Sequence, residues 1–369
     1  MKTLIVCGLF TFCVLCLGLQ LLAQSTSLQP PISAFNELGE PIASMKTIDQ
    51  VEPRRPIYEL PYQITNEGAY YLLNSMQGLA TNDGIVIKSS NVELDMRGFG
   101  LFGVSNSFSG VKIEVPLGQT EVHNITILNG VIGKWGGYGI NGSNAFDSET
   151  SRIKVFENGG GGIVLGPRAT IRECNVDQSR GGGIDVRDGS RITGCRIFGN
   201  LGTGIKASVG SKIYSCLTVE NGGDGIYAGD FATVRECQSA GNHSNGIVVG
   251  HSCQVFENIC TMNGMTNSSG AGILIYGNSC RIENNNLNVN YCGIYLTNGA
   301  NRIDNNHVMG NIYGIKDEGQ GNFIVRNSVG NSSISNYVVT SESICSERFL
   351  NPPSGFSISN PWANFEFGP

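Results

Sequence analysis

Residues 183–203 read GIDVRDGSRITGCRIFGNLGT, and residues 204–224 read GIKASVGSKIYSCLTVENGGD. Both segments are 21 residues long, begin with Gly-Ile and carry a cysteine at the same place. Short runs such as Ile184-Asp185-Val186 alternate apolar and polar residues, which favours half-buried strands. Glycine, asparagine and serine mark turns between these runs. A repeat of this length predicts a solenoid, in which each unit packs only against its neighbours.

The repeat extends over most of the chain. Most of its steps are 21 residues, one is 23, and one is 26 because Met265 to Ser269 form a predicted inserted loop. Two markers in one phase predict coils that stack residue on residue. The first marker is the Gly-Ile pair, whose glycines are Gly139, Gly162, Gly183, Gly204, Gly225, Gly246, Gly272, Gly293 and Gly314. The second is a slot that holds Cys174, Cys195, Cys216 and Cys237 and then Asn258, Asn285, Asn306 and Asn327.

These patterns predict an all-β fold: a right-handed, single-stranded parallel β-helix with coils of about 21 residues and three short strands per coil. No segment inside the repeat has the apolar spacing of a helix. A leucine-rich repeat needs several spaced leucines per unit, which these coils lack. Calcium-binding nonapeptide repeats need a period of nine, whereas Gly222 to Gly225 resemble such a unit only once.

The second marker predicts a ladder of inward side chains at a turn. Stacked asparagines can hydrogen-bond to the backbone and to one another, and a buried cysteine can fill the same slot as a small apolar residue. Twelve cysteines occur, of which nine lie beyond the predicted leader. A metal or disulfide ladder is the alternative, but in-register side chains point the same way, so we favour free, structural cysteines. Another slot is predicted as a tight inward corner: it holds Ala169, Ser190, Ser211, Ala232, Cys253 and Cys280.

The ends of the chain differ from the repeat. Residues 1–23 are predicted as a signal peptide, because Lys2 precedes a long apolar run that ends in Ala23; an uncleaved membrane anchor is the alternative. Residues 24–61 are a predicted Pro-rich linker and N-terminal segment, 62–340 the β-helix, and 341–369 an aromatic tail that packs on the solenoid. The protein is therefore expected to be secreted, extracellular or at the cell surface, with no transmembrane segment after cleavage.

Composition narrows the class of partner. The net charge is −6, which argues against nucleic acid, since that partner requires a basic stripe. The four histidines are scattered, so no metal site and no cofactor are predicted.

The chain resembles a largely uncharacterised family of secreted bacterial right-handed β-helix proteins. The resemblance rests on residues 45–54, 62–73 and 91–99, the Gly-Ile repeats, and the ending Asn360-Pro361-Trp362-Ala363-Asn364-Phe365. The wider pectate-lyase-like superfamily includes pectate lyases, polygalacturonases, alginate epimerases and phage tailspikes, which implies a link to polysaccharides. No polygalacturonase-like Asn-Thr-Asp, Gly-His-Gly or epimerase-like Asp-Pro-His-Glu motif is present, so the resemblance assigns no active site.

The residue after each Gly-Ile pair should point outward, and these positions contain two candidate sites. One is charged: Asp185, Arg187, Asp188 and Lys206, with Asp224 at a nearby turn. A lyase acting on uronic acids needs a cation or calcium to neutralise the substrate carboxylate, and a base to take the proton beside it, so this patch is a candidate catalytic site. Ion pairing between neighbouring coils is the alternative that we favour.

The other candidate is apolar: Tyr227, Val248, Leu274, Tyr276 and Tyr295. Its tyrosines are candidate binding residues, because exposed aromatic rings suit stacking on sugars and a large apolar patch often marks a contact. The alternative is that Trp362 and Phe365 of the tail cover it.

Three functions follow. The first is a surface scaffold that binds polysaccharide or extracellular matrix without catalysis. The second is a polysaccharide lyase, epimerase or hydrolase that acts on acidic glycans, and the third is a purely structural spacer. The oligomeric state does not follow from the sequence.

Overall fold

The computed structural model describes residues 53–265, 269–352 and 359–368. The predicted signal peptide, and residues 24–52 of the predicted linker, therefore lie outside the described residues. Residues 54–369 form one compact unit. All strands of the described residues lie in this unit, and no helix occurs among those residues.

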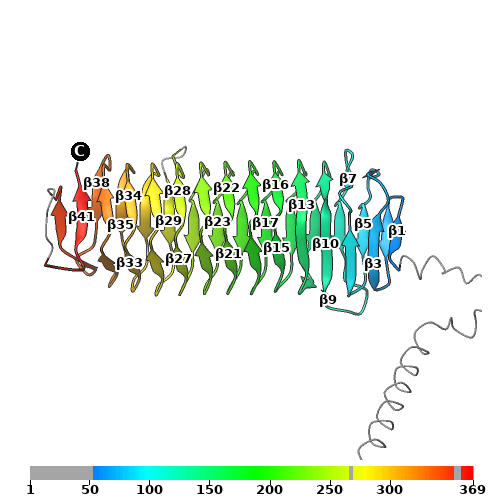
Figure 1. Cartoon of the computed structure of the whole chain (residues 1–369), viewed down its shortest axis with the longest axis horizontal. Coiled ribbons are helices and arrows are strands. Elements are labelled where there is room, and N and C mark those ends of the chain that lie inside the picture. Colours follow the sequence, from blue (N-terminus) through cyan, green and yellow to red (C-terminus); the bar gives the residue numbers. More distant parts are fainter. Residues whose placement is uncertain (1–52, 266–268, 353–358, 369) are drawn as a thin grey trace, which may run out of the picture. The chain divides into compact units, whose positions relative to one another are not determined.

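One coil shows how the repeat folds. It contains β17 (Ile184–Val186), β18 (Arg191–Thr193) and β19 (Arg196–Phe198), each of three residues. The next coil repeats them as β20 (Ile205–Ala207), β21 (Lys212–Tyr214) and β22 (Leu217–Val219). Each strand pairs in parallel with its counterpart 21 residues later. The predicted fold class, coil length and three short strands per coil are confirmed, and Figure 1 shows the coils following one another along this unit.

The strands form two large sheets and one small one. The 13-stranded sheet takes one strand from each coil: β2 (Tyr62–Ile64), β5 (Ile85–Ile87), β8 (Val111–Ile113), β11 (Ile140–Gly142), β14 (Ile163–Leu165), β17, β20, β23 (Ile226–Ala228), β26 (Ile247–Val249), β29 (Ala271–Ile275), β32 (Cys292–Leu296), β35 (Tyr313–Asp317) and β38 (Ser335–Val338).

The 26-stranded sheet takes the others: β1 (Arg55–Ile57), β3 (Gly68–Leu72), β4 (Met76–Gln77), β6 (Val92–Asp95), β7 (Gly100–Phe102), β10 (Ile125–Gly133), β13 (Glu149–Phe156), β15 (Thr170–Arg172), β16 (Asn175–Asp177), β18, β19, β21, β22, β24 (Thr233–Arg235), β25 (Gln238–Ala240), β27 (Gln254–Phe256), β28 (Ile259–Thr261), β30 (Arg281–Glu283), β31 (Asn286–Asn288), β33 (Arg302–Asp304), β34 (His307–Met309), β36 (Phe323–Val325), β37 (Ser328–Gly330), β39 (Ile344–Cys345), β40 (Arg348–Leu350) and β41 (Asn364–Phe367). The small sheet pairs β9 (Val122–His123) with β12 (Ala145–Phe146).

The core is a stack of identical or similar side chains. The isoleucines of successive Gly-Ile pairs lie above one another; Ile184 is 1% exposed, and Ile205, Ile226 and Ile247 are fully buried. Full burial of one such side chain contributes about 1.5–3 kcal/mol. The β-branched shape of isoleucine suits this pleated, tightly stacked surface.

A ladder of side chains closes the sharp corner between the two strands of the 26-stranded sheet in each coil. The Asn285 Oδ1 accepts hydrogen bonds from the backbone N–H and the Nδ2 of Asn258, both at 3.0 Å. The Asn285 Nδ2 donates to the carbonyl of Val255 at 3.0 Å. The predicted asparagine ladder is confirmed, and each rung satisfies polar groups that would otherwise be buried without partners.

Cysteines take the same role earlier in the ladder. The Cys237 Sγ accepts from the backbone N–H of Cys216 at 3.5 Å and donates to the carbonyl of Ile213 at 3.7 Å. These bonds match those of asparagine but are longer and weaker. Hydrogen bonds with Cys195 and Cys237, together with burial, raise the pKa of Cys216, so that the thiol stays protonated. All nine cysteines of the described residues are free, and all but Cys345 are buried.

Two further ladders occupy the other corners. One was not predicted, although its 21-residue spacing is visible in the sequence: Asn200, Asn221, Asn242, Asn263, Asn290 and Asn311. The other is the predicted inward corner, where small residues and then Cys253 and Cys280 give way to Asn301 and Asn322. There the Asn301 Oδ1 accepts from the backbone N–H of Cys280 at 2.9 Å.

The C-terminal segment completes the solenoid. Strand β41 pairs with β37, and its Asn364 Oδ1 accepts from the backbone N–H of Asn327 at 2.9 Å, which adds one more rung to the first ladder. Strands β39 to β41 therefore lie beyond the predicted β-helix end at residue 340, just as β1 lies before the predicted start at 62.

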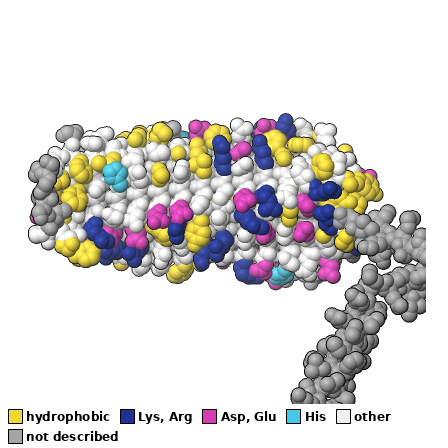
Figure 2. Space-filling model, in the orientation of Figure 1, with side chains coloured by type: hydrophobic (Ala, Val, Ile, Leu, Met, Phe, Trp, Pro, Cys, Tyr) yellow, Lys and Arg dark blue, Asp and Glu magenta, His cyan; other side chains and the backbone are white. Residues whose placement is uncertain are grey.

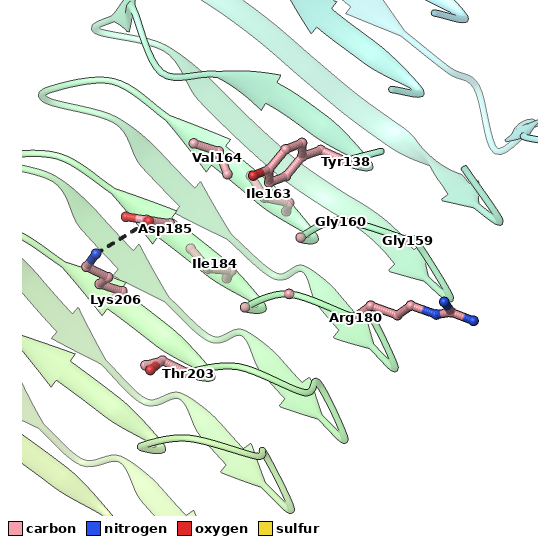
Figure 3. A pocket seen from close by; sticks show the side chains of 13 residues that line it. Tyr138, Gly159, Gly160, Ile163, Val164, Arg180, Ile184, Asp185, Thr203 and Lys206 are labelled. Atoms are coloured by element: carbon pink, nitrogen blue, oxygen red, sulfur yellow. Dashed lines mark ion pairs between the residues drawn. The ribbon is translucent and has the colours of Figure 1, made fainter. Parts of the chain in front are cut away.

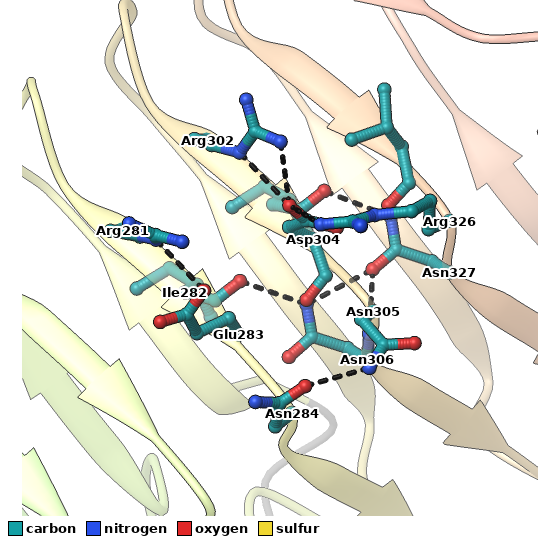
Figure 4. A network of polar contacts seen from close by, with 12 residues as sticks. Arg281, Ile282, Glu283, Asn284, Arg302, Asp304, Asn305, Asn306, Arg326 and Asn327 are labelled. Carbon is teal, nitrogen blue, oxygen red and sulfur yellow. Dashed lines mark hydrogen bonds and ion pairs between the residues drawn. The ribbon is translucent and has the colours of Figure 1, made fainter. Parts of the chain in front are cut away.

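A buried carboxylate ties this end to the coils before it (Figure 4). Asp304 is fully buried, and its oxygens accept from Arg302 at 2.7 Å and from Arg326 at 2.6 Å. Both guanidinium groups lie over the ring of Trp362, at 5.4 and 5.2 Å from its centroid. Burial alone would raise the pKa of Asp304, but the hydrogen bonds from Arg326 and Arg302 outweigh it and hold the pKa below its usual range.

The ladder predicts that two substitutions in the same slot lower the free energy of unfolding by different amounts. Asn285→Ala leaves the buried backbone N–H of Asn258 without an acceptor and removes the donor to the carbonyl of Val255, so we expect the free energy of unfolding to fall by about 2–4 kcal/mol. Cys216→Ala removes only weak sulfur contacts and should cost about 1 kcal/mol. Urea unfolding followed by circular dichroism measures both; equal losses would contradict the role of the asparagine ladder.

The Asp304 cluster predicts an acid dependence of stability. Because the pKa of Asp304 is lower in the folded than in the unfolded protein, its carboxylate stabilises the fold above the unfolded pKa of about 4, and this stabilisation is lost as the pH falls through the folded pKa. Asp304→Asn should lower the melting temperature at pH 7 and flatten its decline in acid. The control is Asp188→Asn, an exposed carboxylate, which should leave the melting profile unchanged.

Candidate functional site

The outer side of the 13-stranded sheet carries both sequence-predicted sites. Pairing places the predicted outward residues in one column, each beside the next. In order they are Val164, Asp185, Lys206, Tyr227, Val248, Leu274, Tyr295 and Lys316. The period-2 alternation of a strand turns them outward while their neighbours fill the core.

Only part of the predicted charged patch comes together. Asp185 Oδ2 and Lys206 Nζ are 3.9 Å apart, with about half of each side chain exposed, so their pairing adds little stability. Arg187 and Asp188 are exposed and take part in no ion pair within the described residues. Asp224 does not join them either, because its Oδ1 accepts from the backbone N–H and the Nδ2 of Asn245 at 3.0 and 2.8 Å.

A groove of about 370 Å³ lies beside this ion pair (Figure 3). Its walls come from four successive coils and include an aromatic ring, an ion pair and a run of glycines. The lining residues are Tyr138, Gly159, Gly160, Gly161, Ile163, Val164, Arg180, Gly181, Gly182, Ile184, Asp185, Thr203 and Lys206.

The glycines let neighbouring turns approach closely. A Cβ at Gly159 would lie 2.3 Å from the carbonyl oxygen of Gly136, so no larger residue fits there. A Cβ at Gly161 would lie 3.1 Å from the ring of Tyr138, which packs on this glycine. Tyr138 remains 38% exposed and forms one end of the groove, with the ion pair at the other. The sequence analysis did not single out Tyr138, although it directly precedes a Gly-Ile pair.

The predicted tyrosine stripe divides into two parts. The rings of Tyr227 and Tyr276 are stacked with centroids 6.1 Å apart and planes 16° apart, and their hydroxyls are 2.9 Å apart. Val248 faces outward between their coils yet is only 4% exposed. Burial and the hydrogen bond to Tyr227 raise the pKa of Tyr276, so its hydroxyl remains neutral.

Tyr295 belongs to a separate cluster. Its hydroxyl donates to Glu318 at 2.5 Å, and the Lys316 Nζ lies 4.7 Å from its ring centroid. The hydrogen bond to Glu318, with burial, raises the pKa of Tyr295.

Two polar groups next to the tyrosine pair were missed from sequence. The ring of His251 meets that of Tyr276 edge to face at 6.5 Å, and Asp230 accepts from the backbone N–H of His251 at 2.8 Å. The C-terminal tail lies elsewhere, since Trp362 packs against Phe323 on the 26-stranded sheet. Figure 2 shows that acidic and basic side chains are interspersed over the visible surface.

The described residues contain no group of three or more histidine, cysteine or acidic side chains placed to hold a metal ion. None of their segments forms a helix long and apolar enough to cross a membrane.

The family model of the right handed beta helix region matches residues 73–213 and 188–334. The chain belongs to this family. The right-handed β-helix predicted from the sequence agrees with this membership. A comparison with curated proteins gave no match.

Several solved structures share the β-helix. The A-modules of the mannuronan C-5 epimerases AlgE4 and AlgE6 of Azotobacter vinelandii superpose with TM-scores of 0.58 and 0.56, both at 15% identity. They cover 76% and 86% of this chain and 91% and 90% of their own. A tailspike protein of E. coli bacteriophage HK620, in complex with a pentasaccharide, superposes at 0.52 with 11% identity, covering 82% of this chain and 72% of its own. At these identities the likeness shows the fold alone.

Proposed function

We propose that this protein binds a polysaccharide along the outer side of the 13-stranded sheet, at the groove between Tyr138 and the Asp185–Lys206 pair. The observation that carries the proposal is the groove itself, which combines a partly exposed aromatic ring with charged and backbone polar groups. Aromatic rings stack on apolar faces of ligands, and a few placed polar groups orient them.

The direction of the column suits a long ligand. Equivalent residues recur from coil to coil about 4.8 Å apart, so a linear polymer can meet a similar surface repeatedly as it passes from β14 to β23. The stacked pair Tyr227–Tyr276 lies further along the same side of the sheet and extends this surface.

Known β-helix proteins support the choice of ligand class. The similar structures include two enzymes named for mannuronan and a tailspike solved with a pentasaccharide. The apolar run near the N-terminus supports a site of action outside the cell. No residue of the groove is assigned a catalytic role.

The test compares two exposed tyrosines. Binding of the full chain to acidic and neutral polysaccharides is followed by affinity electrophoresis and calorimetry. Tyr138→Ala should weaken binding about tenfold, the loss of about 1.4 kcal/mol expected from one ring contact. The control is Tyr58→Ala, which removes a tyrosine that is 62% exposed in the first coil and should leave the affinity unchanged.

Two results would contradict the proposal. One is a folded protein that binds none of the polysaccharides. The other is an equal effect of Tyr138→Ala and Tyr58→Ala.

A further inference from the structure

At one position of the coil, the backbone N–H group donates to a side chain in some coils and has no acceptor among the described residues in others. This position is the residue immediately before the glycine of each Gly-Ile pair or its equivalent, which we call the rim position. Where an acidic or amide residue stands there, its oxygen accepts the backbone N–H of the rim position in the next coil. Asp83 accepts from Ser109 at 2.8 Å, Asp224 from Asn245 at 3.0 Å, and Asn245 from Ala271 at 2.8 Å.

In the groove, glycines replace these acceptors. Gly161 and Gly182 occupy two successive rim positions, and Thr203 occupies the next. Among the described residues no acceptor is found for the backbone N–H groups of Gly182 and Thr203, nor for those of Tyr138, Gly161 and Asp224 at the neighbouring rim positions. Gly161, Gly182 and Thr203 all line the groove. Gly182 and Thr203 are half-buried. A half-buried N–H group without a protein acceptor can donate to an oxygen from outside the chain, either of water or of a ligand.

An oxygen that accepts from one of these N–H groups would lie beside the Cα of the rim residue one coil earlier. Asp83 and Asp224 carry their carboxylates at that place. Beside Gly182 an added Cβ would lie 3.0 Å from the carbonyl oxygen of Thr203, a close contact, and 4.0 Å from its backbone nitrogen, with no other residue within 4 Å. Beside Gly161 the space is narrower, because the Tyr138 ring borders it.

The charges of the groove favour an anion there. Its charged lining residues are Arg180, Lys206 and Asp185. Asp185 pairs with Lys206, whereas Arg180 has no ion pair within the described residues. Figure 3 shows Arg180 extending outward beside the glycines. Hydrogen bonds from backbone N–H groups to a carboxylate are shorter and stronger than those to neutral oxygens.

We infer that the N–H groups of Gly182 and Thr203 bind carboxylate groups of an acidic polysaccharide, one coil apart. The inference rests on the proposed function for the polymer, and the internal contacts of Asp83 and Asp224 identify the chemistry. A uronate group then takes the place that the protein's own carboxylate fills in other coils.

The test supplies the acceptor oxygen from a side chain of the protein itself. Gly182→Asn supplies an amide oxygen to the N–H of Thr203, as Asn245 does for Ala271, without adding charge. It should lower the affinity for oligogalacturonate at least tenfold and raise the melting temperature. Gly182→Ala adds a Cβ without an acceptor and should change the affinity less than threefold. Equal effects of the two variants would overturn the inference.

A second measurement needs no variant. Amide hydrogen exchange of the wild-type chain should slow at Gly182 and Thr203 when oligogalacturonate is added, and not when a neutral glucan is added. Unchanged exchange at both amides would overturn the inference. Equal protection by sodium acetate would also overturn it, because the site would then bind any small carboxylate rather than the polymer.

The outcomes separate this inference from the proposed function. Binding of a neutral polysaccharide that depends on Tyr138 but not on Gly182→Asn would leave the proposed function standing and remove the carboxylate site. Binding of oligogalacturonate that depends on neither residue would remove both.

Discussion

In-register parallel pairing between coils is the constraint on which the rest of the structure depends. Because each strand pairs with its counterpart one repeat later, every side chain lies directly on its equivalent. An inward polar group therefore always has the same neighbours, and it is satisfied only if the next coil supplies a partner. The three corner ladders meet this demand with asparagine, and the cysteine rungs meet it more weakly.

The same constraint leaves the outer side free to vary. The inward isoleucines of the 13-stranded sheet are nearly invariant, whereas the outward column changes from valine to aspartate, lysine and tyrosine. Residues on the outer side can therefore change without altering the core. The groove lies where glycines allow neighbouring turns to approach closely.

This division explains how much the sequence could predict. The period and phase of the sequence repeat predict the fold, the first ladder and the outward column, because these three features depend only on a residue's position within the repeat. The groove could not be predicted this way, since Tyr138 and Gly161 lie in different coils and come into contact only through the packing of the turns. The separation of Tyr295 from Tyr227 depends on a hydrogen bond to Glu318, which a slot pattern does not contain. The last rung of the first ladder does not follow from the period, because Asn364 comes 37 residues after Asn327 in the chain.

The rim position is affected both by the regular pairing between coils and by the variation of the outer side. At Asp83, Asp224 and Asn245 the side-chain oxygen of the rim residue accepts the backbone N–H of the rim residue in the following coil. At Gly161 and Gly182 the chain gives up that side chain in two adjacent coils, while Asp224 and Asn245 retain it in the two coils beyond Thr203. Among the described residues, the rim N–H groups of five successive coils, from Tyr138 to Asp224, therefore have no protein acceptor. The omission is understandable if the acceptor is a ligand that follows the solenoid with the spacing of its coils.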